Sequence, residues 1–393
     1  MLKEKIRALA ADIHDEVVAH RRRLHANPEL SFQEHQTAAY VKAELDKLAI
    51  KWKPVAGTGI LGIIEGKAPG KVIALRADMD ALPIHEANDV SYASKNPGVM
   101  HACGHDFHTA SLLGTARILS SLKGEWDGSV KLFFQPGEEM LPGGASLMIK
   151  DNVLVDPAPV AVIGQHAMPS MPVGKIGVRK GKFMASMDAL SIRIRGRGGH
   201  GAMPEQNIDP VVIASHIVIA LQHIVSRMAS PKQPTVLSIG KVVADGAINI
   251  IPDEVYMEGT FRAMDESWRN EAHKRMVAMA TTIAESMGAT CEFKITRGYP
   301  FLVNEEKLTG QLQRIATDYL GEENVIESDL WMASEDFAYY SHVSNSCFYM
   351  TGTCNLSKSI TSGLHTPTFN IDEDALRLST GLMAFLSVEV LRC

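Results

Sequence analysis

Two kinds of hydrophobic pattern divide the chain. In the first 182 residues, short continuous apolar runs alternate with segments whose apolar residues recur at helical spacing. Three of these runs lie within KVIALRADMD (71–80), SVKLFFQPGEEM (129–140) and PVAVIGQHAMP (159–169). Continuous apolar runs of this length are typical of strands buried on both faces of a parallel sheet. The pattern therefore predicts an α/β fold with a doubly wound, mostly parallel sheet.

The pattern changes near Gly181. The stretch ALSIRIRGRGG (189–199) alternates apolar and polar residues, which is typical of a half-exposed antiparallel strand. Two helical patterns, at 209–228 and 266–287, are separated by two further strands and followed by one more. The resulting order β-α-β-β-α-β is the ferredoxin-like arrangement. We therefore expect an inserted α+β domain at 183–296, with 1–182 and 297–393 forming one domain around the parallel sheet.

Composition and charge narrow the class of protein. The chain has 393 residues, 46% of them apolar, which is enough for two domains. Its net charge of −6, without a basic stripe, argues against nucleic acid and anionic membranes as partners. Charges interrupt the first 25 residues, and no run of about 18 apolar residues occurs. Together with five irregularly spaced cysteines, these features lead us to expect a cytoplasmic protein.

The segment MHACGHDFH (100–108) is dense in side chains that bind metals. It places the thiol of Cys103 two residues before the imidazole of His105, and sulfur with nitrogen is the ligand pair that zinc-type ions prefer. Apolar residues at helical spacing follow, so we expect a loop that leads into a helix. The positive end of that helix would favour the Cys103 thiolate. The alternative is a buried cysteine among hydrogen-bonded histidines.

Further donors follow the other buried runs, and together they suit a pair of adjacent divalent ions bridged by one group and a water. The candidate ligands are Cys103, His105, Glu139, His166 and His365. We expect Cys103 to bridge the two ions. Asp80 would accept a ring N–H of His105 or a neighbouring imidazole and fix its tautomer. Glu138, beside a ligand, would act as the general base toward the bridging water.

Two glycine-rich segments require separate interpretations. Gly57-x-Gly59-x-x-Gly62 matches a dinucleotide-binding fingerprint, but its apolar run comes after the glycines rather than before them, which predicts a turn into a hairpin. His200 lies in GGHGAMPE, where small residues let the backbone approach a ligand. Because His200 is far in sequence from every candidate ligand, we expect its loop to reach over a site.

Eight motifs in this order resemble those of the dinuclear metal-dependent amidohydrolases. That group includes hippurate hydrolase, N-acetyldiaminopimelate deacetylase and the indole-3-acetyl-amino-acid hydrolases, with aminoacylase and the glutamate carboxypeptidases as more distant members. The motifs are HACGHD, FQPGEE, the His166 loop, GGHGAMPE, NIIPD, GTFR, SEDFAYY and LHTP. The resemblance covers almost the whole chain.

The resemblance implies the same five metal ligands and the same base. It also implies that Asp80 is an orienting carboxylate, and that distant relatives carry a metal-binding histidine where this chain has Asp78. The inserted domain would mediate homodimer formation, and His200 would cross to the partner's site to stabilise the oxyanion. Asn249 and Arg262 would bind the carboxylate of the substrate, which a planar Arg fork matches. Phe107 would narrow the entrance.

These expectations combine into one hypothesis: hydrolysis of the amide of an N-acyl amino acid with zinc or manganese, or with nickel or cobalt. The nearest alternative is a dipeptidase or carboxypeptidase with the same dinuclear site. A non-catalytic binding protein would lack the base at Glu138, and a structural zinc protein would carry a closed Cys-rich tetrad. A thiol hydrolase using Cys103 and His105 is the remaining alternative.

Overall fold

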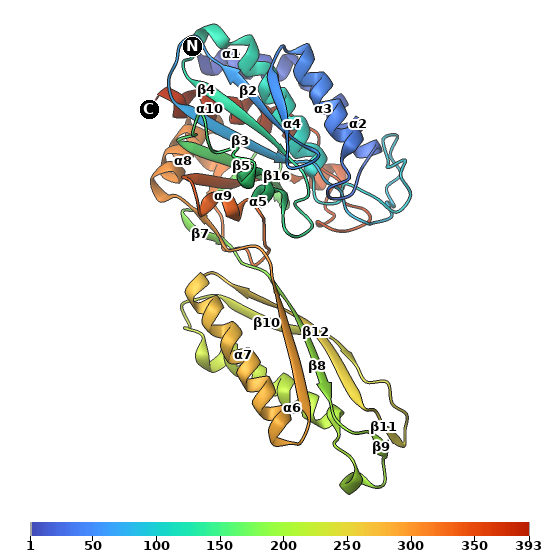
Figure 1. The fold of residues 1–393 in the computed structure, drawn as a ribbon. Helices are drawn as coiled ribbons and strands as arrows, with labels where there is room; N and C mark the ends of the chain where they lie inside the picture. Colours follow the sequence, from blue (N-terminus) through green and yellow to red (C-terminus); the bar gives the residue numbers. More distant parts are fainter. Residues whose placement is uncertain (1, 393) are drawn as a thin grey trace. The chain divides into compact units, whose positions relative to one another are not determined.

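The computed structural model describes residues 2–392, which form two compact units (Figure 1). The second unit consists of Met184–Leu302 and Trp331–Glu335, and the first contains the rest. The second unit extends past the expected end at 296 because the linker after it is paired with the entering chain. Gly298 N–H donates to Met187 O (2.9 Å), and Met187 N–H donates to Tyr299 O (3.1 Å).

The first unit is built on an eight-stranded sheet. Its order is β1 (Lys51–Val55), β2 (Gly59–Glu65), β4 (Ser129–Gln135), β3 (Val72–Asp78), β5 (Ala161–Pro172), β16 (Ser346–Cys354), β6 (Ile176–Val178) and β15 (Val325–Glu327). The central strands β4, β3, β5 and β16 are mutually parallel. This is the α/β fold with a mostly parallel sheet that the sequence predicts.

Helices cover both faces of this sheet unequally. Residues of the longer helices share one large apolar core with the sheet. These helices are α1 (Leu2–Asp12), α3 (His35–Lys47), α4 (His105–Ser121), α8 (Glu306–Leu320) and α10 (Asp374–Arg392), and α2 (His14–Ala26) packs against α4. The short helices α5 (Gly144–Lys150) and α9 (Ala338–Ser341) contact each other, and the ring of Tyr340 in α9 lies 5.7 Å from that of Phe133 in β4, centroid to centroid.

One strand differs from the sequence expectation. His166 was expected just past the end of its strand, but β5 continues for six residues beyond it, to Pro172. The reason is the partner strand β16, which pairs with β5 from Ser346↔Val162 through Met350↔His166 to Cys354↔Pro172. His166 therefore projects from the middle of β5, and the pairing of β5 with β16 on both sides of His166 holds it in place.

The second unit has the ferredoxin-like order. Its sheet runs β10 (Thr235–Val243), β12 (Glu254–Ala263), β8 (Asp188–Arg195), β13 (Thr290–Arg297), with every neighbouring pair antiparallel. Helices α6 (Pro210–His223) and α7 (Glu266–Ser286) pack on it around a separate core. A two-stranded ribbon of β9 (Gly199–His200) and β11 (Ile250–Ile251) lies at one end.

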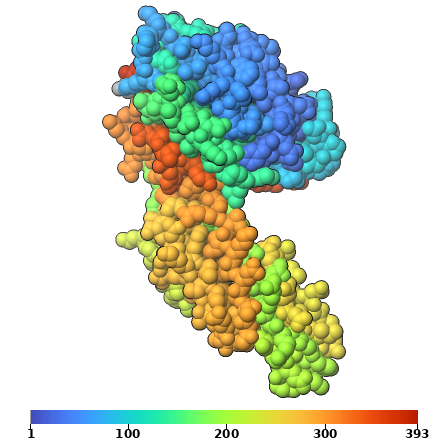
Figure 2. Space-filling model, viewed as in Figure 1, coloured from blue at the N-terminus to red at the C-terminus, as the bar shows by residue number. Residues whose placement is uncertain are grey.

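Helix α6 has an unusual surface. With the turn that follows, it forms an apolar segment, Pro210–Met228, that is long enough to cross a membrane by length and composition. Within the second unit, its Ile213, Ile217 and Leu221 are buried in the core. Val212 and Ile219 on the other side are 50% and 68% exposed. In the space-filling view, the second unit spans the green-to-orange range of the colour scale (Figure 2).

Candidate metal centre

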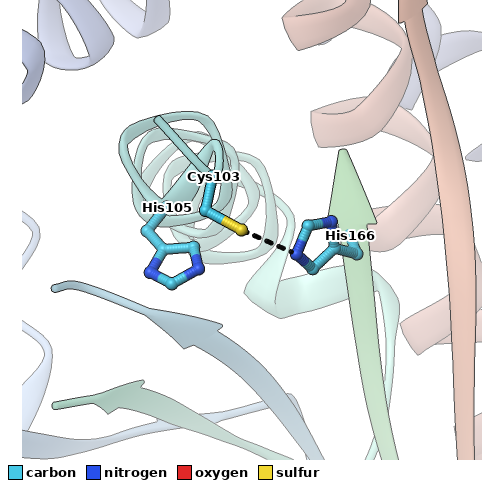
Figure 3. Close-up of side chains that lie close together, drawn as sticks. All are labelled: Cys103, His105 and His166. Carbon is cyan, nitrogen blue, oxygen red and sulfur yellow. Dashed lines mark hydrogen bonds between the residues drawn. The ribbon is translucent and has the colours of Figure 1, made fainter. Parts of the chain in front are cut away.

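The five candidate ligands lie together, beside the carboxyl ends of β3 and β4 and the middle of β5. His166 Nε2 lies 3.4 Å from Cys103 Sγ (Figure 3). A second imidazole also lies near the thiol: His365 Nε2 lies 3.3 Å from Cys103 Sγ and 3.3 Å from Glu139 Oε1. His105 Nε2 lies 4.0 Å from Glu139 Oε1. Side chains spread over 262 residues of sequence therefore share one site.

The loop before α4 brings the thiol close to β5. Gly104 has φ +91°, and a Cβ at this position would lie 2.8 Å from Ala167 Cβ. Only glycine allows both the left-handed backbone and this close approach. His105 then begins α4 directly, so the helix start fixes its ring beside the ends of the strands.

Donor atoms group into triads that share the thiol. Cys103, His105 and His166 form one set, and Cys103, Glu139 and His365 form another, with ligand atoms within 4.8 Å of one another. His105 Nε2 and Glu139 Oε1 are buried and form no hydrogen bond among residues 2–392, and the nearest imidazole to Glu139 Oε1 is that of His365, whose charge depends on its protonation. Buried polar atoms left without partners are costly, and a cation would satisfy both. The residues therefore fit two neighbouring divalent ions, with Cys103 common to both donor sets.

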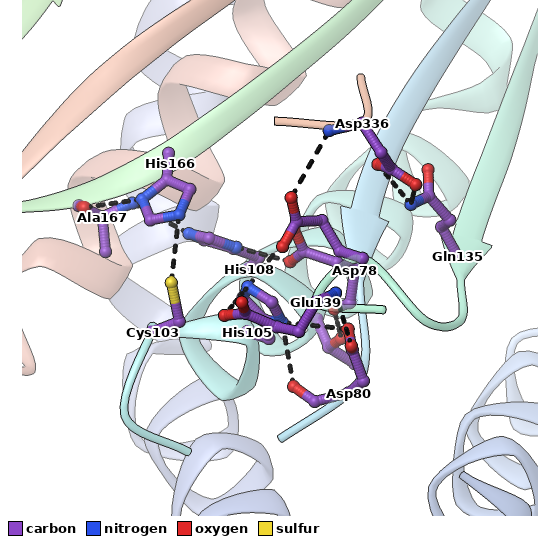
Figure 4. Close-up of polar contacts among 12 residues, drawn as sticks. Asp78, Asp80, Cys103, His105, His108, Gln135, Glu139, His166, Ala167 and Asp336 are labelled. Carbon is purple, nitrogen blue, oxygen red and sulfur yellow. Dashed lines mark hydrogen bonds and ion pairs between the residues drawn. The ribbon is translucent and has the colours of Figure 1, made fainter. Parts of the chain in front are cut away.

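Asp80 holds two of these groups in place. The ring Nδ1 of His105 lies 2.8 Å from the Asp80 backbone oxygen and 3.1 Å from its Oδ1. An Nδ1–H that donates to oxygen leaves Nε2 as the free ligand atom. The other oxygen, Oδ2, accepts from Ser31 Oγ (2.6 Å). It also accepts from the backbone N–H of Glu139 (2.9 Å), which lies beside Asp80 in Figure 4.

Glu138 is buried beside this ligand set. Glu138 is only 6% exposed. Its Oε1 accepts a 3.4 Å hydrogen bond from the backbone N–H of Asp336. The loop from Pro136 to Glu139 follows β4, so consecutive residues turn one carboxylate to the thiol and the other to Asp336. Ligand atoms of Glu138, Glu139 and His105 also lie within 4.8 Å of one another.

Electrostatics at the site favour a bound cation. Burial and the carboxylates of Glu139 and Glu138 raise the pKa of the Cys103 thiol well above its usual range. Burial and these carboxylates therefore oppose the help toward a thiolate that we expected from the helix start. Burial and His108 lower the pKa of His166, which keeps that ring neutral. Burial alone would lower the pKa of His105, but Asp78 and Asp80 raise it to about 10.

Asp78 and His108 border the site without free donor atoms. His108 Nδ1 lies 2.6 Å from Asp78 Oδ1, and its Nε2 accepts the backbone N–H of Ala167 (2.8 Å). A ligand atom of His108 lies within 4.8 Å of ligand atoms of Asp78 and His105, but both of its ring nitrogens already form hydrogen bonds, so we do not assign it as a ligand. Asp78 is also paired with the buried guanidinium of Arg76 (2.5 Å), which in turn reaches Asp336 (2.8 Å).

Sequence reasoning missed Arg76 and Asp336. Both are completely buried, and their network with Asp78 and Gln135 lies behind the site. A signal was present, because an arginine inside the apolar run of β3 must find buried partners. Phe107 was placed wrongly at the entrance: it is fully buried in a core cluster with Leu24 and Met100.

Three further candidates lie in the second unit. His200 is exposed on β9, and its Nδ1 accepts the backbone N–H of Ala202 (3.1 Å), so its proton lies on Nε2. Asn249 lies beside it, because its backbone oxygen accepts from Gly201 (2.9 Å). Arg262 lies near the last residue of β12, whereas Asn249 precedes the first. The Nη1 of Arg262 is buried without a hydrogen-bond partner among residues 2–392, and burial lowers the pKa of its guanidinium.

Known proteins share this chain's sequence and fold. The family model described as peptidase family M20/M25/M40 matches residues 74–387. An N-acyl-L-amino acid amidohydrolase from Geobacillus stearothermophilus is 46% identical over 78% of this chain and 83% of its own. Thermostable carboxypeptidase 2 from Saccharolobus solfataricus is 39% identical over 99% and 98%.

A solved structure agrees. The Bacillus subtilis YXEP protein, described as a dinuclear metal-binding peptidase of the M20 family, superimposes with a TM-score of 0.83 at 36% identity and covers 97% of this chain and 99% of its own. The resemblance inferred from the motifs is confirmed, as is the predicted class of metal-dependent amidohydrolase. The chain belongs to peptidase family M20/M25/M40.

Proposed function

We propose that this protein hydrolyses the amide bond of N-acyl amino acids, releasing a carboxylate and a free amino acid, with two divalent ions in each subunit. The observation that carries the proposal is the thiol of Cys103, which is shared by two donor triads beside the buried carboxylate of Glu138. A structural zinc site would be a closed tetrad without such a carboxylate. The raised pKa of Cys103 argues against a thiol nucleophile.

The proposed mechanism assigns one task to each residue. Ions held by the five ligands would polarise the scissile carbonyl and acidify a water. Glu138 takes the proton of the attacking water and delivers it to the leaving nitrogen, so that the C–N bond breaks as the amine forms. His200 donates its Nε2–H to the developing oxyanion. Arg262 and Asn249 bind the free carboxylate of the amino acid.

Strand length supports a site completed by two subunits. Asn249 lies beyond the start of β12, and Glu254 and Arg262 are eight residues apart along that strand. Eight residues of strand span roughly 26 Å, so Asn249 and Arg262 of one subunit cannot hold the same carboxylate. The proposal therefore takes Arg262 from one subunit, and Asn249 with His200 from its partner.

The second unit offers a surface for this dimer. The outer side of α6 exposes Val212 and Ile219. Strand β10 is an edge strand and exposes Val242 and Val243 at 58% and 44%. Exposed apolar side chains on a helix and on an adjoining sheet edge are typical of a subunit interface. We propose a homodimer in the cytoplasm that pairs through this surface.

The alternative function is that of a carboxypeptidase or dipeptidase. The 39% identity to thermostable carboxypeptidase 2 favours it, because the same carboxylate-binding residues would serve a peptide. An acyl group and an aminoacyl group differ at the α-amino group, so a substrate panel separates the two functions.

The test uses metal-free protein reconstituted with zinc, manganese, nickel or cobalt. Each form is assayed with N-acetyl, N-benzoyl and indoleacetyl amino acids and with dipeptides of the same C-terminal residues. The proposal predicts higher kcat/KM for the N-acyl substrates with at least one metal. Higher kcat/KM for dipeptides would favour the alternative, and no hydrolysis with any metal would refute both.

A further inference from the structure

Two segments from outside the ligand set hold the loop Pro136–Glu139. One is the turn before α3, which contains Phe32 and Glu34. The other is the turn between β1 and β2, which contains Gly57 and Thr58, together with Gly59 at the start of β2. Neither segment contributes a ligand to the proposed centre, yet both pack directly on the loop that carries Glu138 and Glu139.

The carboxylate of Glu34 joins the two segments to the loop. Its Oε1 accepts the backbone N–H of Phe32 (2.9 Å) and that of Gly137 (2.8 Å), one residue before Glu138. Its Oε2 accepts the hydroxyl of Thr58 (2.5 Å). Glu34 is completely buried and forms no salt bridge among residues 2–392. Burying a carboxylate costs much free energy unless it is hydrogen-bonded. The three hydrogen bonds of Glu34 offset this cost, and the presence of a carboxylate at this position requires an explanation.

Close packing accompanies these hydrogen bonds. Gly137 has φ +57°, and a Cβ there would lie 2.3 Å from the ring of Phe32. A Cβ at Gly59 would lie 2.8 Å from Pro136 Cδ. Of the three glycines that formally matched a dinucleotide fingerprint, Gly59 therefore lets the start of β2 approach the loop, beside the hydrogen bond of Thr58 to Glu34. The Phe32 ring therefore leaves no room for a side chain at Gly137.

We propose that Glu34 is a positioning residue, which through its hydrogen bond to the backbone of Gly137 holds Glu138 and Glu139 in their working geometry. This inference rests on the proposed function, in which Glu138 is the base and Glu139 a ligand. It differs from a purely structural role because the braced atoms lie one and two residues from the reacting groups. Displacements on the order of 1 Å at such positions can lower turnover about 100-fold.

The experiment compares three variants with the wild-type enzyme. Glu34→Ala removes all three contacts. Glu34→Gln keeps an oxygen for the two N–H groups and presents an amide that can donate to Thr58. All three hydrogen bonds, which we call the Glu34 brace, can therefore still form. Glu305→Ala is the matched control: Glu305 likewise accepts two backbone N–H groups, at Lys307 and Leu308, but it caps α8. Each protein is measured for kcat, KM, metal content, Tm and amide hydrogen exchange at 137–139.

The proposal predicts a specific combination of results. Glu34→Ala lowers kcat about 10- to 100-fold with little change in KM, and it speeds amide exchange at 137–139. Glu34→Gln restores kcat to within about threefold of wild type, and Glu305→Ala lowers Tm without changing kcat or that exchange. If Glu34→Ala does not fold, Thr58→Val replaces it, with the same predicted direction and a smaller decrease.

Two results would overturn the brace. One is a kcat for Glu34→Ala (or Thr58→Val) within about twofold of wild type, and the other is a Glu34→Gln enzyme as impaired as Glu34→Ala. Failure of the proposed function is distinguishable, because it would appear as wild-type protein without hydrolysis of any N-acyl substrate. In that case the exchange rates at 137–139 still decide whether Glu34 holds the loop.

Discussion

At the scale of single residues, the site depends on which atoms are left free. His105 and His108 lie one helical turn apart and are equally buried, but His108 uses both nitrogens in hydrogen bonds and His105 keeps Nε2 free. Glu138 and Glu139 are adjacent, yet Glu139 reaches the thiol side and Glu138 reaches Asp336. Residue type alone does not separate such pairs; their hydrogen-bond partners do.

Replacing the proposed base tests this separation. We expect Glu138→Gln to bind metal at the wild-type ratio, because Glu138 is outside the shared triads, and to lose about 10²- to 10⁴-fold in kcat. Metal analysis and steady-state kinetics on one preparation measure both. Near-native turnover in this variant would exclude Glu138 as the base.

Metal affinity should depend on pH through Cys103. Because burial and neighbouring carboxylates raise the pKa of its thiol, the proton must be displaced when a cation binds. Affinity should therefore rise with pH, and a chelator should strip metal faster at pH 6 than at pH 8. Cys103→Ala should weaken both sites together. Metal affinity that is constant between pH 6 and 8 would contradict a thiolate ligand.

The sequence pointed to the five candidate donors, which the structure brings close together, because each sits in a short motif at the end of an apolar run or in a loop. It could not predict Arg76–Asp336, which joins residues 260 positions apart. It also placed His166 past a strand end, since the length of β5 is set by pairing with β16. Donor identity is local information, whereas strand length and buried ion pairs depend on distant partners.

At the scale of secondary-structure elements, a buried ion cluster ties β8 to α7. Asp188 of β8 accepts from Arg269 of α7 at 2.6 and 2.9 Å and lies 2.6 Å from His273 Nε2. Arg269 also donates to the backbone oxygens of Met187 and Gly298, on the two chain segments that lead out of the second unit. The cluster therefore fixes both segments to one helix.

This cluster should make the second unit sensitive to acid. Burial alone would raise the pKa of Asp188, but hydrogen bonds from His273 and Arg269 lower it. A carboxyl group whose pKa is lowered by folding stabilises the folded state at pH values above the usual carboxyl pKa near 4. This stabilisation is lost as the pH falls below that value. We expect Asp188→Asn to lower Tm most at pH 7, with the difference narrowing toward pH 3. A difference that is independent of pH would show that the charge of Asp188 is not responsible.

At the scale of the whole molecule, the order of helices and strands was predictable from the sequence. Which residues of the second unit can serve the same site was only partly predictable. Alternating buried runs and helices indicate the parallel sheet, and the change of pattern near Gly181 indicates the inserted unit. The distance between Asn249 and Arg262 could not be read from the sequence, because it depends on the pairing of β12 with β8 and β10. That distance is what supports a shared site.

Subunit mixing tests the shared site. His200→Ala and Glu138→Gln should each be nearly inactive alone. When the two variants are mixed under conditions that allow subunit exchange, half of the dimers contain one subunit of each. Each mixed dimer has one complete site out of two, so roughly a quarter of wild-type activity should return. Activity that stays at the level of the separate variants, with exchange verified by mass, would place His200 in its own subunit's site.

The central claim is that one thiol is shared by two ions that together support hydrolysis. The most direct measurement is a titration of metal-free protein with the activating metal, following bound metal and the hydrolysis of an N-acyl amino acid in the same samples. The account predicts saturation at two ions per subunit, with activity appearing as the second ion binds. Saturation at one ion, or full activity in the metal-free protein, would contradict it.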